Sequence, residues 1–66
     1  MQIVVNGDVL DVVDSCTIAV ILEKFEIGIE RVAVEVNQDI VPKVQYNTHQ
    51  LSPGDKVEIV QFVGGG

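Results

Sequence analysis

The 66-residue sequence predicts an α+β fold in which a mixed sheet of four to five strands packs on one main helix. Three observations predict it. An Asn-Gly pair joins two short apolar runs, apolar residues then recur at helical spacing, and valine-rich segments follow. We expect residues 1–63 to form this domain and residues 64–66 to be a flexible glycine tail.

A hairpin is predicted at the start of the chain. Its strands are "QIVV" at residues 2–5 and "DVLDVV" at residues 8–13. Asn6-Gly7 suits a type I′ turn, in which both central residues need positive φ. Ile3 and Val5 are expected to share one face, whereas the facing of the second strand is ambiguous, because both of its alternating sets contain apolar residues.

A helix is predicted after the hairpin. Four apolar residues recur at helical spacing: Ile18, Ile21, Leu22 and Phe25. Thr17 is the expected N-cap. The β-branched run at its start also fits a strand, but Gly28 favours a helix, because a glycine at the C′ position commonly ends one.

Three further strands complete the sheet. They are "RVAVEV" at 31–36, a short edge strand within "IVPKVQY" at 40–46, and "KVEIVQFV" at 56–63. A hairpin that feeds one helix packed across a mixed sheet is the β-grasp arrangement, in which the first and last strands lie side by side at the centre. The same order of elements also fits other small α+β folds. Val32, Val34 and Val36 are expected to face the core.

The composition narrows the classes of function. A core this small leaves little room for an enclosed active site, so we expect a non-enzyme. The formal net charge of -6 disfavours nucleic acid and favours a protein partner with a basic face. The chain shows no membrane-spanning stretch and no basic n-region of a signal peptide, so a cytoplasmic location is expected.

Few side chains are candidates for chemistry. One Cys and one His cannot build a structural zinc site, and one Cys cannot ligate an iron–sulfur cluster. Cys16 is interpreted as a packing residue; the alternative is a thiol-based carrier, because a helix N-terminus can lower a thiol pKa. His49 is interpreted as a surface residue, Tyr46 and Leu51 as packing residues, and Asp55 as a turn residue.

The last strand and the glycines after it form the candidate site. Val57 and Ile59 fall on one face of the strand, and Val60 and Phe62 on the other. We expect the second face to be a docking surface. The alternative is a local bulge that tucks Phe62 into the core.

The glycine tail, Gly64 to Gly66, has two interpretations. Either it is an unselected frayed end, or its terminal carboxylate is the reactive group. A carboxylate is a poor electrophile and needs activation, for example as an acyl-adenylate. Because the chain lacks a phosphate-binding glycine loop, ATP is expected to be bound by a partner. Glycines suit a narrow channel in such a partner, since they have no Cβ.

Several segments together resemble the ThiS family, the sulfur carrier proteins of thiamine biosynthesis. They are "IVVNGD", the helix start at Thr17, "VNQDIVP", "LSPGDKVEIV" and the terminal "FVGGG". These segments cover essentially the whole chain in the family's order. The segment Asp14-Ser15-Cys16 departs from the pattern, and the resemblance gives its cysteine no role.

The resemblance implies a β-grasp carrier protein whose Gly66 is adenylated by an activating enzyme that uses ATP and magnesium. Sulfur from a donor such as a cysteine desulfurase then replaces the adenylate, giving a thiocarboxylate. Thiazole synthase, a (β/α)₈ barrel, takes this sulfur into the thiazole ring. Gly65 is the diglycine neighbour, and Gly64 is an additional glycine. The chain itself is expected to bind neither metal nor cofactor.

Two alternatives share this chemistry. The molybdopterin synthase small subunit also ends in two glycines, but its chain between the third and last strands tends to be longer than "NQDIVPKVQYNTHQLSPGD". A ubiquitin-like protein modifier would form an isopeptide with a lysine instead of a free thiocarboxylate.

Overall fold

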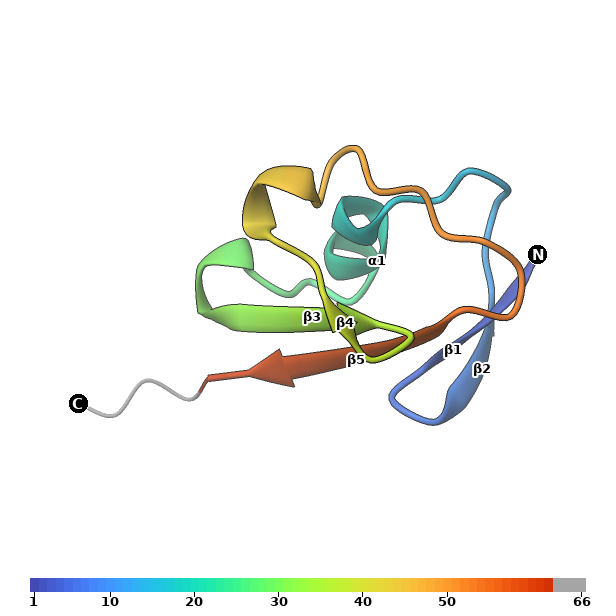
Figure 1. Ribbon diagram of the computed structural model, residues 1–66, viewed down its shortest axis with the longest axis horizontal. Coiled ribbons are helices and arrows are strands. Elements are labelled where there is room, and N and C mark those ends of the chain that lie inside the picture. Colours follow the sequence, from blue (N-terminus) through green and yellow to red (C-terminus); the bar gives the residue numbers. More distant parts are fainter. Residues whose placement is uncertain (63–66) are drawn as a thin grey trace.

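The computed structural model describes residues 1–62, which form a five-stranded mixed sheet packed on one α-helix (Figure 1). The elements are β1 (Gln2–Val5), β2 (Asp8–Asp11), α1 (Ile18–Lys24), the 3-10 helix η1 (Ile29–Arg31), β3 (Val32–Val36), β4 (Asp39–Ile40), the 3-10 helix η2 (Lys43–Gln45) and β5 (Lys56–Gln61). The strand order is β2-β1-β5-β3-β4. β1 and β5 are parallel neighbours at the centre, which confirms the predicted β-grasp arrangement.

The turn between β1 and β2 has positive φ at both Asn6 and Gly7, at 48° and 87°, as the type I′ prediction requires. The Asn6 side chain also reaches across to β5. Its Oδ1 accepts the Ile59 N–H at 2.7 Å, and its Nδ2 donates to the Ile59 carbonyl at 3.2 Å. Because β1 ends at Val5, this amide continues the pairing of β1 with β5 by one further residue.

A second asparagine holds the opposite edge of β5. Asn37 has φ 52° in the turn between β3 and β4. Its Oδ1 accepts the Lys56 N–H at 3.0 Å, and its Nδ2 donates to the Asp55 carboxylate at 3.0 Å. The other Asp55 oxygen accepts the Ser52 N–H at 2.8 Å, which confirms Asp55 as a turn residue. Both asparagines therefore fix the backbone of β5 to the turns of its neighbours.

Helix α1 begins as predicted, with the Thr17 hydroxyl accepting the Val20 N–H at 3.3 Å. Its predicted end at Gly28 is wrong. The helix ends at Lys24, and Glu26, with φ 58°, takes the left-handed position. The Glu26 N–H donates to the Glu23 carbonyl and the Ile27 N–H to the Leu22 carbonyl, which is the Schellman pattern. Phe25, the last of the four apolar residues at helical spacing, lies just after this early end and is 44% exposed.

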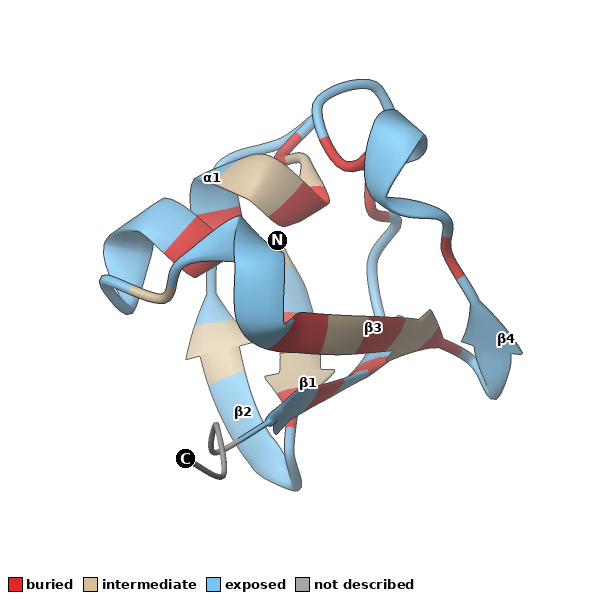
Figure 2. Cartoon of the chain, turned by 90° about the vertical axis from the view of Figure 1, so that its left-hand side faces the viewer, coloured by how far each residue is buried: buried red, intermediate tan, exposed pale blue. Residues whose placement is uncertain are grey.

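The core lies between α1 and one face of the sheet. Residues with 9% exposure or less form one cluster: Ile3, Val5, Cys16, Ile18, Ile21, Leu22, Val32, Val34, Val36, Val41, Tyr46, Leu51, Val57 and Ile59. Figure 2 shows buried and less buried residues alternating along β3, as its valines predict. In β2, Leu10 packs against this cluster, which settles the facing that the sequence left ambiguous.

The segment after β4 differs from the predicted edge strand at 40–46. The strand ends at Ile40, and η2 follows Pro42. Tyr46 then turns inward to only 1% exposure, and its carbonyl accepts the Ala19 N–H in the first turn of α1. Burial of this large side chain favours a helical turn, because an extended chain along the sheet edge would not bring Tyr46 over the helix.

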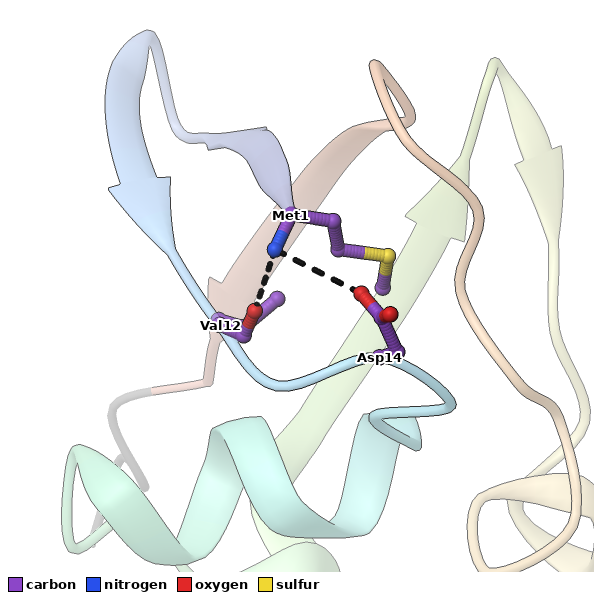
Figure 3. A network of polar contacts seen from close by, with 3 residues as sticks. All are labelled: Met1, Val12 and Asp14. Atoms are coloured by element: carbon purple, nitrogen blue, oxygen red, sulfur yellow. Dashed lines mark hydrogen bonds and ion pairs between the residues drawn. The ribbon is translucent and has the colours of Figure 1, made fainter.

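The second strand is also shorter than predicted, ending at Asp11 instead of residue 13. Figure 3 shows how the hairpin closes at this end. The Met1 amine donates to the Val12 carbonyl at 2.7 Å and lies 3.6 Å from Asp14 Oδ1. The Val12 N–H donates back to the Met1 carbonyl at 2.8 Å.

We predict that Asn6→Gly lowers the free energy of unfolding by about 1–3 kcal/mol, because it leaves the N–H and carbonyl of Ile59 without partners. Glycine accepts the positive φ, so the loss reports the side-chain hydrogen bonds. Gln38→Gly is the matched control, since Gln38 also has positive φ, at 73°, but lies exposed in its turn. Urea unfolding of both variants is the measurement. Equal stability of the two variants would show that the hydrogen bonds from the Asn6 side chain to Ile59 do not stabilise the fold.

Candidate functional site

The end of β5 separates a buried face from an exposed one. Val57 and Ile59 are buried at 1% and 9% exposure, whereas Val60 and Phe62 are 50% and 57% exposed. The alternative in which a bulge tucks Phe62 into the core is therefore wrong. The Phe62 N–H donates to the Arg31 carbonyl at 2.7 Å, so the chain still runs alongside the start of β3 at this residue.

The glycines follow this exposed end in the sequence after one further residue, Val63. Gly64, Gly65 and Gly66, and the tail predicted from them, lie outside the described residues 1–62. Their roles as acyl site and partner contact therefore stay predictions. What the structure describes is the base from which they extend: a central strand held by neighbours on both edges, with an exposed apolar side.

A hollow of about 330 Å³ lies beside Phe62. It is lined by Glu26, Ile27, Gly28, Glu30, Arg31, Val32, Gln61 and Phe62. The early end of α1 forms part of this wall, because the chain turns back at Glu26 towards β3. The hollow is open and partly polar, so it is a feature of the surface beside the tail and not an enclosed reaction chamber.

The sheet face turned away from α1 carries further apolar side chains that sequence analysis did not single out. We call it the open face. Its members share one side of the sheet by their register: Gln2, Val4, Val9, Asp11, Ala33, Glu35, Ile40, Lys56, Glu58 and Val60. In Figure 1, α1 and the 3-10 helices lie on the other side of the sheet. Val9 and Ile40 are 66% and 72% exposed.

The register between neighbouring strands is what places these residues on one face. Val60 lies opposite Ala33, and Val9 lies opposite Val4. The apolar surface begun by Val60 and Phe62 thus belongs to a face that extends over several strands. Alternation within one strand predicts which residues of that strand lie on the same face, but not which residues of other strands join them. Val60 could therefore be predicted from the sequence, whereas Val9 and Ile40 were missed.

Cys16 is confirmed as a packing residue, with 2% exposure. Its Sγ lies 3.6 Å from the Thr17 carbonyl, beneath a hollow of about 320 Å³. Burial raises the pKa of the Cys16 thiol, and the positive charge of Lys24 opposes this effect only in part. A carrier thiol needs an accessible thiolate, and this environment disfavours one.

The structure also shows where the other candidate side chains lie. Tyr46 and Leu51 are buried, as predicted, and burial raises the pKa of the Tyr46 phenol. His49 is half-buried in the loop after η2, not fully at the surface. Within residues 1–62, no group of three or more His, Cys, Asp or Glu side chains is placed to hold a metal ion. Nor does this part of the chain contain a helix long and apolar enough to cross a membrane.

The chain is similar to known proteins over its whole length. The model of the ThiS family matches residues 3–66. A thiazole synthase of Paramagnetospirillum magneticum is 41% identical over all of this chain, which spans only 20% of that enzyme. The sulfur carrier protein ThiS of Escherichia coli is 30% identical, with both chains fully covered. The crystal structure of the thiamine biosynthesis protein ThiS from Geobacter metallireducens superimposes with a TM-score of 0.83 at 29% identity, again with both chains fully covered.

We predict that Cys16 is not a carrier group. Iodoacetamide should alkylate the folded chain much more slowly than the urea-unfolded chain near pH 8, because burial hides the thiol and raises its pKa. Cys16→Ser should lower the free energy of unfolding by about 1–2 kcal/mol, since it places a hydroxyl in an apolar site. Sulfur transfer by the folded variant should stay nearly intact.

Alkylation rates and intact mass after sulfur transfer are the measurements. A folded Cys16→Ser variant that has lost all thiocarboxylate formation would contradict the packing role and revive the thiol carrier. Val36, which is 6% exposed and distant in sequence, offers a control: Val36→Thr introduces a hydroxyl into the same core without touching a thiol.

Proposed function

The chain belongs to the ThiS family of sulfur carrier proteins in thiamine biosynthesis, and we propose that it carries sulfur as a thiocarboxylate on Gly66. It is a carrier and not an enzyme, as the family is. The single observation that carries the proposal is the family match, which runs to residue 66 and so includes the terminal glycines. The exposed Val60 and Phe62, a few residues before those glycines in the sequence, support it.

The chemistry follows from the carboxylate. At neutral pH the C-terminal carboxyl group is an anion, because α-carboxyl groups ionise well below that pH. A Gly66 carboxylate oxygen attacks the α-phosphorus of ATP, and pyrophosphate leaves. A persulfide sulfur of the donor then attacks the acyl carbon, AMP leaves with the electron pair of the broken bond, and an acyl disulfide forms. A second thiol attacks the donor sulfur of this disulfide, forms a disulfide with it, and so releases the thiocarboxylate. The resulting sulfur is nucleophilic and stays attached to a protein.

The reagents for these steps are assigned to partners. ATP and magnesium belong to an adenylating activating enzyme, and the sulfur comes from a donor such as a cysteine desulfurase. Both assignments rest on the family. They also suit a small domain whose core side chains are almost all apolar.

Thiazole synthase is the proposed acceptor of the sulfur. Thiazole synthases from two bacteria contain a segment that matches all of this chain and makes up 20% of their length. Joining two modules in one polypeptide raises the effective concentration of one for the other. These fused proteins therefore support thiazole synthase as a partner, in preference to molybdopterin synthase or a lysine to be modified. A cytoplasmic location stays a prediction.

The first test concerns the exposed end of β5. Phe62→Ala should leave the free energy of unfolding within about 0.5 kcal/mol of the wild type, because the ring is largely in solvent. The same variant should bind the activating enzyme more weakly. Ile59→Ala is the neighbouring control on the buried face and should cost about 2–5 kcal/mol. A stable Phe62→Ala variant that binds as tightly as the wild type would remove Phe62 from the docking surface.

The second test concerns the C-terminal carboxylate. Adding one residue after Gly66 moves the carboxylate off its position, and Gly65→Phe widens the segment that must thread the activating enzyme. Both changes should abolish ATP-dependent adenylation and leave the melting temperature nearly unchanged, because the core described above is built from residues between Ile3 and Ile59. Val44→Phe, at an 87% exposed position of η2, is a control that should be adenylated normally.

Intact mass decides the result. An adenylate and then a one-sulfur-for-oxygen exchange at the C-terminus are expected for the wild type, whereas an isopeptide-linked conjugate would point to a protein modifier. An extended variant that is adenylated without first losing its added residue would refute Gly66 as the acyl site.

A further inference from the structure

The outer edge of β2 carries backbone groups that no other strand of the sheet uses. β2 is the first strand in the order β2-β1-β5-β3-β4, so it has a neighbour on one side only. Along an antiparallel pair, residues that exchange both backbone hydrogen bonds with the partner alternate with residues whose N–H and carbonyl point away from it. Met1 and Val12 exchange both bonds, at 2.7 and 2.8 Å. Leu10 therefore bonds to β1 as well, whereas Val9 and Asp11 direct their backbone groups outward.

Hydrogen bonds on the far side of β1 agree with this assignment. Val4, which lies opposite Val9, donates its N–H to the Asp55 carbonyl at 2.9 Å, away from β2. Within residues 1–62, no backbone hydrogen bond outside the β1–β2 pair engages Val9 or Asp11. The unpaired groups of an edge strand are a template for a further strand. The opposite edge of the sheet offers a much shorter template, because β4 has only two residues.

An apolar hollow lies beside this outer edge. It is the hollow of about 320 Å³ above Cys16, between the end of the hairpin and α1. Val12 and Val13 line it from the hairpin, and Val20 and Ile21 line it from α1. Val13 and Val20 are 72% and 46% exposed, so the hollow presents apolar surface to solvent. A strand added to β2 would place every second side chain on the α1 side of the sheet, over this hollow.

We propose that the outer edge of β2 and this hollow, together the β2 edge site, bind an extended segment of a partner protein in which apolar and basic residues alternate. Outward N–H and carbonyl groups of Val9 and Asp11 pair with the backbone of that segment, and its apolar side chains enter the hollow. Its basic side chains lie on the open face, where the Asp11 carboxylate is. They do not lie over the hollow, because Lys24 stands at its wall. This inference does not depend on the proposed function.

The charge of the edge favours such a partner over a second copy of this chain. Asp8 and Asp11 are in β2, and Asp14 follows shortly after it. Two copies paired through β2 would bring these aspartates together in one interface, and the formal net charge of -6 on each chain adds to the repulsion. Charged side chains on an edge strand commonly prevent self-pairing in this way. A basic segment instead meets the same aspartates with attraction.

The β2 edge site lies away from the end of β5. β5 runs parallel to β1, passes the hairpin turn where Asn6 bonds to Ile59, and continues to Gln61 (Figure 1). The hollow lies at the other end of the hairpin, where Met1 bonds to Val12. A segment bound at the β2 edge site therefore leaves the end of β5 accessible. Holding the chain there would raise the effective concentration of that end for a second site on the same partner.

The test uses the peptide Thr-Val-Lys-Val-Lys-Val-Thr with both ends blocked, which places valines and lysines on opposite faces of a strand. Amide hydrogen exchange of the whole chain is followed by NMR with and without about 1 mM peptide. In the free chain, the Val9 and Asp11 amides should exchange much faster than the Leu10 amide, which is bonded within the hairpin. The peptide should slow exchange at Val9 and Asp11 at least about threefold and leave Leu10 nearly unchanged.

A matched pair of variants tests the hollow. Val20→Arg fills the hollow with a cationic side chain and should abolish the protection at the same peptide concentration. Val44→Arg adds the same charge at an 87% exposed position of η2 and should leave the protection as in the wild type. Melting temperatures of both variants should stay close to that of the wild type, because neither valine is buried. Equal effects of the two variants on binding would overturn the assignment of the hollow.

Two N-methylated forms of the peptide test the backbone pairing, one methylated on the lysine nitrogens and one on the valine nitrogens. Only every second amide of an added strand faces β2, so one form should lose binding and the other should keep it. Equal binding of both forms, or unchanged exchange at Val9 and Asp11, overturns the proposal. Protection of these amides in the free chain that is lost on dilution would assign the edge to a second copy and overturn it too. Because no step involves ATP or Gly66, failure here leaves the proposed function intact.

Discussion

The position of β5 between β1 and β3 is the constraint on which the rest of this structure depends. β5 pairs in parallel with β1 and antiparallel with β3, so its backbone groups find partners on both edges. Where β1 ends, the Asn6 amide takes over the pairing at Ile59, and Asn37 holds Lys56 on the other edge. A strand anchored in this way has no freedom to rotate, and each of its side chains is committed to one face.

The fixed orientation of the β5 side chains links the core to the open face. Val57 and Ile59 pack under α1, and burying each of them completely is worth about 1.5–3 kcal/mol. The same alternation sends Glu58 and Val60 to the opposite face, where they meet side chains from β3. A slip of one residue would exchange the two sets. The packing that stabilises the domain therefore also determines which side chains lie on the open face.

The small size of the domain limits what its core can contain. A core of 14 buried apolar residues supports one helix and one sheet, with no enclosed site among the described residues for activating a carboxylate. Its single cysteine is buried, and burial raises the pKa of the thiol, which disfavours a thiolate there. Under the proposed function, ATP, magnesium and the sulfur donor belong to partner proteins.

Local signals in the sequence determined a good part of this fold. The Asn6-Gly7 turn, the Thr17 cap and the alternation of valines in β3 each depend on neighbouring residues, so they could be predicted without the rest of the chain. Membership of the ThiS family also follows from the sequence, and with it the expectation for Gly66. These features depend on local backbone preferences, on the periodicity of apolar residues and on the order of segments, all of which the sequence contains.

Only the tertiary structure decided the features that depend on residues far apart in the chain. Glu26 takes the left-handed position that Gly28 was expected to take, because an early end of α1 lets Ile27 pack against the core. Tyr46 draws its segment out of the sheet edge to fill space against α1. The pairing of Glu35 with Glu58, which are 23 positions apart (58 minus 35), requires the register of two strands. Register is set by the packing of the whole core, and no local pattern contains it.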